Sequence, residues 1–271
     1  MKIRALALDL DGTLTNSQKE VTPATRAALD AARQKGVKII LASGRPVVGV
    51  MPVARELELE KKGGYILAYN GGQILDCATG ETLHQSRLAP DSIPRICEFA
   101  RRRGLAFLTY DREGVITENA GDEYIQKEAW INRLPVRQVE DLPAEVDFPV
   151  TKMLVVGPPQ QTENAERAMR AQFKGEFDCF RSEPYFLEVV PMGVEKAASL
   201  EILLKKLGID REELMACGDG FNDLPMLRYA GLGVAMANAQ SAVKQAADRV
   251  TLSNDEDGVA AAVKQYILSE T

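Results

Sequence analysis

Residues 3–14 read IRALALDLDGTL, a short aliphatic run that stops at two aspartates, Asp9 and Asp11. An almost continuous apolar run of this length is typical of a buried strand in a parallel sheet. The two carboxylates would then stand at the carboxyl end of that strand. Because residues i and i+2 of an extended chain share a face, both could point into one crevice, and Gly12 lets the chain turn away after them. Open parallel sheets bind ligands at that edge, so this stretch predicts where a site lies.

The composition is that of an ordinary globular protein. The chain has 271 residues, of which 45% are hydrophobic and 27% are charged. This length suggests about two domains. The net charge of -6 argues against nucleic acid or an anionic membrane as partner, because both require a basic surface. A small anionic substrate is compatible with it if the local charges are arranged to bind one.

Cysteine and histidine usage excludes several kinds of chemistry. The four cysteines, Cys77, Cys97, Cys179 and Cys217, form no C-x-x-C pair, which leaves zinc and thioredoxin-like sites without support. His84 is the only histidine, so Ser-His or Cys-His catalysis would depend on that one side chain. The apolar start is too short for a signal peptide, and no run reaches the roughly 18 apolar residues of a membrane span. We therefore expect a cytoplasmic protein.

Strand-like and helix-like segments alternate in the first and last parts of the chain. After the opening strand we expect a helix at 22–35, a strand at 37–42, a helix at 46–60 and a strand at 65–69. Pro23 suits the first turn of the first helix, and Gly36 follows its end. The alternation resumes at Val194 with a helix to 207, a strand at 214–217 and two further strand–helix units. This rhythm predicts βαβ units and a parallel sheet.

The middle of the chain has a different character. Residues 71–86 alternate around Thr79-Gly80 as an antiparallel hairpin does. Beyond them we expect helices near 91–103, 122–133 and 162–173, and strands near 105–110, 115–117, 152–156, 177–181 and 185–190. The predicted fold is therefore α/β: a Rossmann-like parallel sheet core made of residues 1–83 and 191–271, with an inserted α+β domain at residues 84–190.

Polar side chains recur where strands of the predicted core end or the next helix begins. They are Asp9, Asp11, Ser43, Lys196, Asp219, Asn222 and Asp223. In a parallel sheet these ends meet at one edge, where several carboxylates stay ionised together only beside a cation. The cluster thus predicts a hard divalent metal, magnesium in particular, which favours carboxylates, water and substrate phosphate. Lys196, Ser43 and the backbone amides after Asp9 would bind that phosphate.

This set of residues suits transfer of a phosphoryl group to a carboxylate. Asp9 would attack phosphorus and form an aspartyl-phosphate, which divides one very slow step into two easier ones. Asp11 would protonate the leaving alcohol and later take a proton from the attacking water. Because uncatalysed hydrolysis of phosphate monoesters is so slow, with enzymatic accelerations up to roughly 10²¹, metal, lysine and nucleophile have to act together.

Other interpretations of the same motifs fail or stay weaker. Asp-Gly after a strand is often a simple turn, and Lys196 alone would be an exposed helix residue. The stretch from Asp9 to residue 20 resembles a calcium loop, but Leu14 occupies the position that requires glycine. Two G-x-G segments lack the third glycine of a dinucleotide-binding motif. Its position is occupied by Asp223 in one segment and by Met236 in the other.

Taken in chain order, four segments resemble the four motifs of the haloacid dehalogenase-like superfamily, and its Cof-type phosphatases in particular. They are DLDGTL from Asp9, SGR from Ser43, Lys196 and GDGFND from Gly218. The segment YNGG from Tyr69 adds to the resemblance. It spans both core segments, whereas the middle of the chain is supported only by its size and position. Ala197 and Ala237 replace glycines that are common in the family, which affects local loop geometry more than chemistry.

The resemblance implies a role for each matching residue. Asp9 would be the nucleophile, and Asp11 the general acid and base. The phosphoryl group would be bound by Ser43, Gly44, Lys196 and Asn222. Magnesium would be held by Asp9, Asp219 and the backbone carbonyl of Asp11, with Asp223 either a ligand or a neighbour that supports the ligands. The inserted domain would be a cap that closes over the site and selects the substrate.

We therefore expect a magnesium-dependent phosphatase of small phosphorylated metabolites, such as sugar phosphates or phosphorylated cofactors. A phosphomutase is the first alternative, and it would return the phosphoryl group to the substrate. A receiver or binding module that holds a long-lived phosphate on Asp9 is the second. Arg181, Glu183 and Tyr185 are candidates for substrate contacts in the cap. The sequence carries no signal for the oligomeric state.

Overall fold

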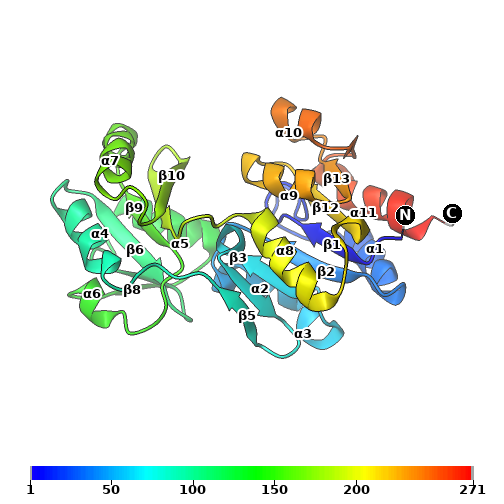
Figure 1. The fold of residues 1–271 in the computed structure, drawn as a ribbon, viewed down its shortest axis with the longest axis horizontal. Coiled ribbons are helices and arrows are strands. Elements are labelled where there is room, and N and C mark those ends of the chain that lie inside the picture. The colour runs from blue at the N-terminus through cyan, green and yellow to red at the C-terminus, as the bar shows by residue number, and fades with distance from the viewer. Residues whose placement is uncertain (1, 270–271) are drawn as a thin grey trace. The chain divides into compact units, whose positions relative to one another are not determined.

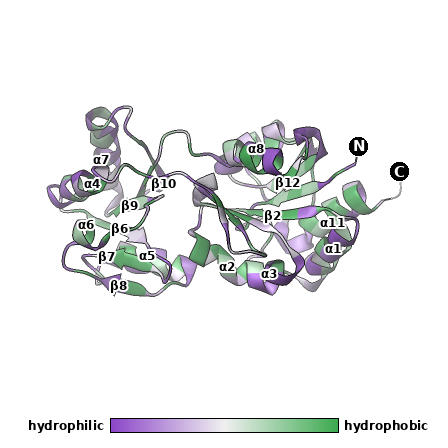
Figure 2. Cartoon of the chain, turned by 60° about the horizontal axis from the view of Figure 1, so that its bottom comes forward, coloured by the Kyte–Doolittle hydropathy of each residue, from purple (hydrophilic) through white to green (hydrophobic). Residues whose placement is uncertain are grey.

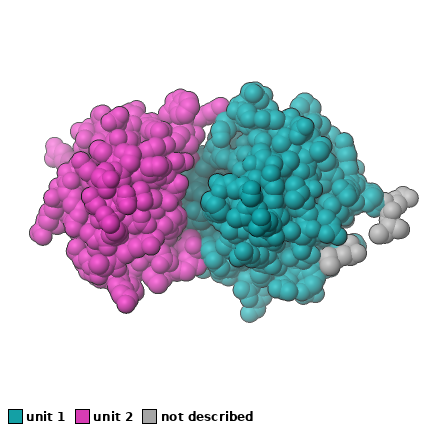
Figure 3. All heavy atoms as spheres, turned by 90° about the horizontal axis from the view of Figure 1, so that it is seen from above, with its two compact units in different colours: residues 1–84, 195–271 teal, residues 85–194 magenta. Residues whose placement is uncertain are grey.

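The computed structural model describes residues 2–269, which belong to two compact units (Figure 3). The first unit combines two separate segments of the chain, Met1–His84 and Glu195–Thr271. The second unit is the continuous segment Gln85–Val194. The first unit carries all the residues for which the sequence predicts chemistry, so its sheet is described first.

An eight-stranded sheet forms the centre of the first unit (Figure 1). Its strands in chain order are β1 (Ala5–Leu8), β2 (Lys38–Ala42), β3 (Tyr65–Ala68), β4 (Gln73–Asp76), β5 (Thr82–Gln85), β12 (Leu214–Gly218), β13 (Leu232–Ala235) and β14 (Arg249–Val250). In space their order is β14-β13-β12-β1-β2-β3-β4-β5. From β14 to β3 all neighbours are parallel, and β4 then turns antiparallel. The predicted α/β fold is confirmed.

The central strands are buried because both of their faces are covered. All four residues of β1 are buried, and Figure 2 shows hydrophobic residues concentrated in such strands. The helices of this unit are α1 (Pro23–Gln34), α2 (Val47–Glu56), α3 (Leu59–Lys62), α8 (Lys196–Leu207), α9 (Leu224–Tyr229), α10 (Ser241–Ala246) and α11 (Gly258–Val263). Leucines of α8 and α9 join alternate residues of the strands in one core, while α1 packs against α11. Because helices cover both faces of the sheet, polar side chains of the core strands lie at the strand ends.

The helix expected at 46–60 is divided in two. α2 ends at Glu56, and α3 begins at Leu59 after Glu58 adopts a left-handed backbone with φ of 55°. A residue in this region interrupts the α-helical hydrogen bonding, as at many helix ends. Apolar periodicity continues across the break because Leu57 and Leu59 are both buried, so the pattern alone gave one helix.

The second unit is built on a six-stranded sheet with the order β10-β11-β9-β6-β7-β8. Its elements are α4 (Ser92–Arg101), β6 (Ala106–Tyr110), β7 (Val115–Thr117), α5 (Glu123–Asn132), β8 (Val136–Gln138), α6 (Leu142–Glu145), β9 (Met153–Val156), α7 (Pro159–Gln172), β10 (Asp178–Glu183) and β11 (Phe186–Val190). The sheet is mixed, with only β7 and β8 parallel among the pairs. Residues of α4 and α7 pack with one face of it in a separate hydrophobic core.

Two short elements of this unit, β8 and α6, were not predicted. β8 reads VRQ and is largely exposed, and α6 is a single turn. Neither is long enough to show a periodic pattern of apolar residues.

No helix among residues 2–269 is long and apolar enough to cross a lipid bilayer.

Candidate active site

Asp9 lies at the carboxyl end of the central strand of the first unit. β1 is paired with β12 on one side and β2 on the other, and the amide of Asp9 donates to the carbonyl of Cys217 at 3.0 Å. This bond extends the ladder by one residue and fixes the backbone that carries the carboxylate. The side chain is nearly buried, since Asp9 is 7% exposed. A carboxylate so withdrawn from water requires compensating partners.

Lys196 is the main partner of Asp9. It is the first residue of α8 and is completely buried. Its ammonium group donates to Oδ1 of Asp9 at 2.7 Å and to Oδ1 of Asp223 at 2.6 Å. Burial alone would lower the pKa of Lys196, but the two carboxylates, Asp223 first, outweigh this effect and raise it. The lysine is therefore held as a cation between two acids.

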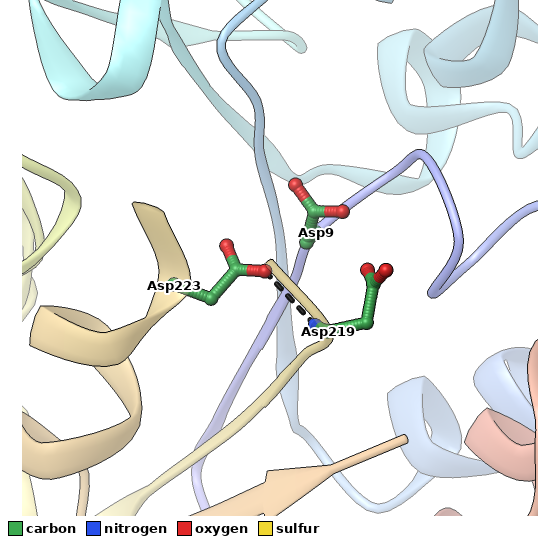
Figure 4. A group of neighbouring side chains, drawn as sticks. All are labelled: Asp9, Asp219 and Asp223. Carbon is green, nitrogen blue, oxygen red and sulfur yellow. Dashed lines mark hydrogen bonds between the residues drawn. The ribbon is translucent and has the colours of Figure 1, made fainter. Parts of the chain in front are cut away.

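Asp223 uses both carboxylate oxygens within the protein. Oδ1 accepts from Lys196, and Oδ2 accepts from the backbone amides of Asp219 and Gly220, each at 2.9 Å. Asp223 is fully buried and lies in the short 3-10 turn that precedes α9. It thus fixes both the lysine and the loop that follows β12. Figure 4 shows this contact between Asp223 and the amide of Asp219.

Asp219 approaches from the loop after β12, and a threonine orients it. The hydroxyl of Thr13 donates to its Oδ1 at 2.8 Å. Gly12, with φ of 82°, lies so close that a Cβ there would be 2.5 Å from Oδ2 of Asp219. Only glycine satisfies both the backbone conformation and this approach. The Asp-Gly-Thr turn after β1 is therefore shaped around Asp219.

Asp9, Asp219 and Asp223 form a group that could hold a metal ion (Figure 4). Among the described residues, one ligand oxygen from each lies within 4.8 Å of the other two. Burial and the charge of Asp223 raise the pKa of Asp9 to about 8, although Lys196 acts the other way. Burial also raises the pKa of Asp219, against the hydrogen bond from Thr13. Three carboxylates beside one ammonium leave a negative excess, so the residues fit a divalent cation.

The carboxylate of Asp11 belongs to a different group. Nε and Nη2 of Arg45 donate to its two oxygens at 2.7 and 2.5 Å, and Lys19 donates to Oδ1 at 2.6 Å. Burial would raise the pKa of Asp11, but the hydrogen bonds and charges of Arg45 and Lys19 lower it. β1 ends at Leu8, and Asp11 forms an isolated β-bridge with Thr15 beyond it. The expectation that both carboxylates point into one crevice stays a prediction.

The predicted phosphate-binding residues lie at the ends of two strands. Ser43 is buried directly after β2, and its Oγ accepts from the amide of Arg45 at 3.1 Å. Gly44 comes next, and a Cβ on it would lie 3.2 Å from Oδ1 of Asn70. Asn222 is exposed in the loop after β12, and its Nδ2 donates to that same Oδ1 at 3.0 Å. Asn70 therefore contacts both of the segments that carry these residues.

Sequence reasoning assigned no role to Arg45, Lys19, Thr13 or Asn70. Arg45 and Thr13 stand inside motifs that the sequence displays, so their positions were visible but their partners were not. Asn70 was visible as the end of β3, where the chain passes into a turn. Lys19 had no signal, because only the return of the chain after Gly12 brings it to Asp11.

Two of the predicted candidates in the second unit, Arg181 and Tyr185, are engaged locally. Nε of Arg181 pairs with Glu166 at 2.9 Å. The ring of Tyr185 stacks on the ring of Tyr124, with centroids 5.7 Å apart. Nζ of Lys127 lies over the ring of Tyr185, 3.7 Å from its centroid. These contacts neither support nor oppose a role in substrate selection, which stays a prediction.

The chain is similar to several known proteins. A family model described as haloacid dehalogenase-like hydrolase matches residues 6–263. The "Putative phosphatase YxeH" of Bacillus subtilis (strain 168) is 33% identical over 98% of this chain and 99% of its own length. The 5-amino-6-(5-phospho-D-ribitylamino)uracil phosphatase YcsE of the same organism is 29% identical over 98% of this chain and 96% of its own.

The fold has solved counterparts as well. A haloacid dehalogenase-like hydrolase from Bacteroides thetaiotaomicron superposes with a TM-score of 0.95 at 46% identity, covering 97% of this chain and 99% of the other. The comparisons confirm the predicted fold, the family and the phosphatase class. This chain belongs to the haloacid dehalogenase-like hydrolase family.

Proposed function

We propose that the chain hydrolyses small phosphomonoesters in a magnesium-dependent reaction that proceeds through an aspartyl-phosphate on Asp9. The observation that carries the proposal is the fully buried Lys196, shared between Asp9 and Asp223 beside Asp219. A lysine in this position holds one oxygen of the nucleophile and leaves the other available for attack. It also supplies positive charge where a phosphoryl dianion would bind.

Asp9, Asp219 and the backbone carbonyl of Asp11 would hold magnesium. Both oxygens of Asp223 are engaged by Lys196 and by backbone amides, which favours a supporting role for Asp223 over direct ligation. Magnesium, when bound, would neutralise charge on the phosphoryl oxygens and favour the ionised form of Asp9. The protein residues then perform the remaining work.

In the first step, an oxygen of Asp9 forms a bond to phosphorus as the bond from phosphorus to the ester oxygen breaks. Asp11 delivers a proton to the departing alcohol. In the second step, a water molecule attacks phosphorus, Asp11 takes its proton, and the bond to Asp9 breaks with release of phosphate. The pairing with Arg45 and Lys19 favours the ionised Asp11 that this second step requires. The proton that Asp11 takes from water in this step is the one that it delivers to the leaving alcohol in the next turnover.

The substrate would be a small phosphorylated metabolite. YcsE is named for a phosphate ester on a ribityl chain, and it covers nearly the whole of this chain. That similarity supports a polyhydroxylated or cofactor-like phosphate as substrate here. We propose that the second unit, Gln85–Val194, is the cap that selects among such compounds. The cytoplasmic location expected from the sequence stays a prediction.

The test is release of inorganic phosphate from p-nitrophenyl phosphate and from a panel of phosphorylated metabolites. The unmodified protein with magnesium should release phosphate, and EDTA should stop it reversibly. Asp9→Asn should lose turnover while keeping its fold. Full activity of this variant, or full activity with EDTA, would contradict the mechanism.

The same assay separates the two alternatives. A phosphomutase would move the phosphoryl group within the substrate with little free phosphate. A receiver module would accumulate phosphate on Asp9 without turnover. Asp11 argues against the receiver, because a second carboxylate that activates water shortens the life of an acyl phosphate.

A further inference from the structure

Three consecutive residues after β3 have a left-handed backbone. The φ angles of Tyr69, Asn70 and Gly71 are 55°, 57° and 98°. Glycine adopts this conformation freely and asparagine tolerates it, whereas tyrosine rarely does. Such strained backbone persists only where the surrounding structure enforces it, and it concentrates at functional sites. We therefore expect the contacts of this turn to serve a function.

The backbone of the turn holds the loop that follows β2. The amide of Asn70 donates to the carbonyl of Ser43, and the amide of Tyr69 donates to the carbonyl of Arg45, both at 2.9 Å. On its other side, the carbonyl of Gly71 accepts a hydrogen bond from the hydroxyl of Ser199 in α8. The turn thus connects the Ser43 loop with the helix that begins at Lys196.

The side chain of Asn70 connects a third segment. Its Oδ1 accepts from Nδ2 of Asn222 at 3.0 Å. The same amide group fills the space beside Gly44, since a Cβ there would lie 3.2 Å from Oδ1 and 3.3 Å from Nδ2. Glycine would relieve the backbone at position 70 at least as well as asparagine, so the backbone conformation alone does not explain the amide.

We propose that Asn70 is a positioning residue of the phosphate site, whose side-chain amide orients Asn222 and supports the peptide of Gly44. This inference rests on the proposed function, because Gly44 and Asn222 are the groups assigned there to the phosphoryl oxygens. Asn70 acts through them. Without the amide, Asn222 loses its partner and the Gly44 segment gains room to move, so phosphate binds more weakly.

The test compares Asn70→Gly with Asn70→Ala in the full chain with magnesium. Asn70→Gly removes the amide and relieves the backbone, whereas Asn70→Ala removes the amide and keeps the strain. Glu58→Gly is the matched control, because Glu58 is a half-buried left-handed residue of the same unit outside the site. Both glycine variants should keep or raise the melting temperature relative to the unmodified protein.

Two binding measurements report the proposed role. The KM for p-nitrophenyl phosphate and the dissociation constant of inorganic phosphate, measured by calorimetry, should both rise roughly tenfold in both Asn70 variants, as expected from one lost hydrogen bond. Neither should change in Glu58→Gly. Asn70→Gly with unchanged KM and unchanged phosphate affinity would overturn the inference. A fall in kcat alone, together with a lower melting temperature, would also overturn it, since that pattern indicates a purely structural role.

A double-variant comparison tests the route through Asn222. If Asn70 acts by orienting Asn222, adding Asn70→Gly to Asn222→Ala should weaken phosphate binding little further. Fully additive, roughly hundredfold, weakening would contradict that route. The calorimetric titration does not depend on turnover. If the unmodified protein hydrolysed no phosphomonoester, the proposed function would be contradicted. The titration would still show whether Asn70 affects phosphate binding.

Discussion

The ammonium group of Lys196 lies 2.6 Å from Oδ1 of Asp223, and neither side chain is exposed to solvent. The lysine begins a helix, and the aspartate lies in a turn 27 positions later in the sequence. Their contact, together with the bond from Lys196 to Asp9, joins three elements at the end of the sheet. It therefore serves both the stability of the unit and the proposed chemistry.

Lys196→Met should be strongly destabilising. Removing one partner of a buried ion pair typically costs about 3–5 kcal/mol, because the remaining charges lose their compensation. Urea unfolding should show this loss. Lys206→Met, an exposed lysine of the same helix, is the control and should differ little from the unmodified protein. Adding Asp223→Asn to Lys196→Met should recover part of the stability. Equal stability of Lys196→Met and the control would contradict the assignment.

Gly12→Ala should weaken magnesium binding. The new Cβ would lie 2.5 Å from Oδ2 of Asp219 and force that carboxylate away. Gly36→Ala is a matched control, since Gly36 has φ of 87° but nothing within 4 Å of an added Cβ. Both variants should lose about 1–2 kcal/mol through backbone strain. Only Gly12→Ala should raise the magnesium concentration needed for half-maximal activity. A similar rise in Gly36→Ala would refute a specific effect on Asp219.

The stability of the metal-free protein should fall as the pH rises from about 5 to about 8. Asp9 has a folded pKa of about 8, raised by burial and by Asp223, against an ordinary value of 3.8. Between these values the folded state binds more protons than the unfolded state, so rising pH favours unfolding. Magnesium, which binds the ionised carboxylate, should raise the melting temperature most at the alkaline end.

Melting curves in EDTA and in magnesium, recorded across this pH range, check that expectation. Asp9→Asn serves as the control, because it cannot titrate at this position. The difference between the two proteins in EDTA isolates the contribution of Asp9 from that of every other group. An identical pH dependence of both proteins would count against a perturbed Asp9.

Arg45→Met should slow the hydrolysis of esters with poor leaving groups more than that of esters with good leaving groups. Arg45 holds both oxygens of Asp11 with its planar fork, and lysine cannot reproduce that geometry. Alkyl phosphates need the proton from Asp11 more than p-nitrophenyl phosphate does, and general acid catalysis contributes typically 10²–10⁴-fold. We expect kcat for an alkyl phosphate to fall at least about tenfold more than kcat for the aryl ester.

The comparison of Arg45→Met with Lys19→Met distinguishes the two partners of Asp11. Lys19 makes a single bond from a half-exposed position, so its loss should matter less. Equal losses with alkyl and aryl substrates in Arg45→Met would show that Arg45 does not act through Asp11.

The sequence predicted the sheet, and the strand ends that bring Asp9 and Asp219 together, better than it predicted the contacts between loops. Apolar runs marked β1, β2 and β12, and parallel topology then brought Asp9 and Asp219 to one edge. The fork from Arg45 to Asp11 was beyond prediction, because it depends on how the turn after Leu8 directs a side chain. The same holds for Asn70, whose partners come from loops with no periodicity. Local patterns determine helices and strands, whereas contacts between loops from distant segments depend on the whole fold.

The cap assignment also shows a limit of the sequence. Most of its helices and strands show a periodic pattern of apolar residues, but β8 and α6 are too short to show one. Whether Gln85–Val194 selects substrates stays a prediction.

The placement of β1 between β2 and β12 has a consequence for biosynthesis. Lys196 is 187 positions from Asp9 in the sequence, and β12 follows later still. During translation β1 therefore keeps an unpaired edge until the whole second unit has left the ribosome. Unpaired apolar strand edges invite aggregation, and contacts this distant form slowly. We expect a nascent chain stopped before residue 214 to depend on chaperones, and Asp9 to reach Lys196 only when synthesis is almost complete.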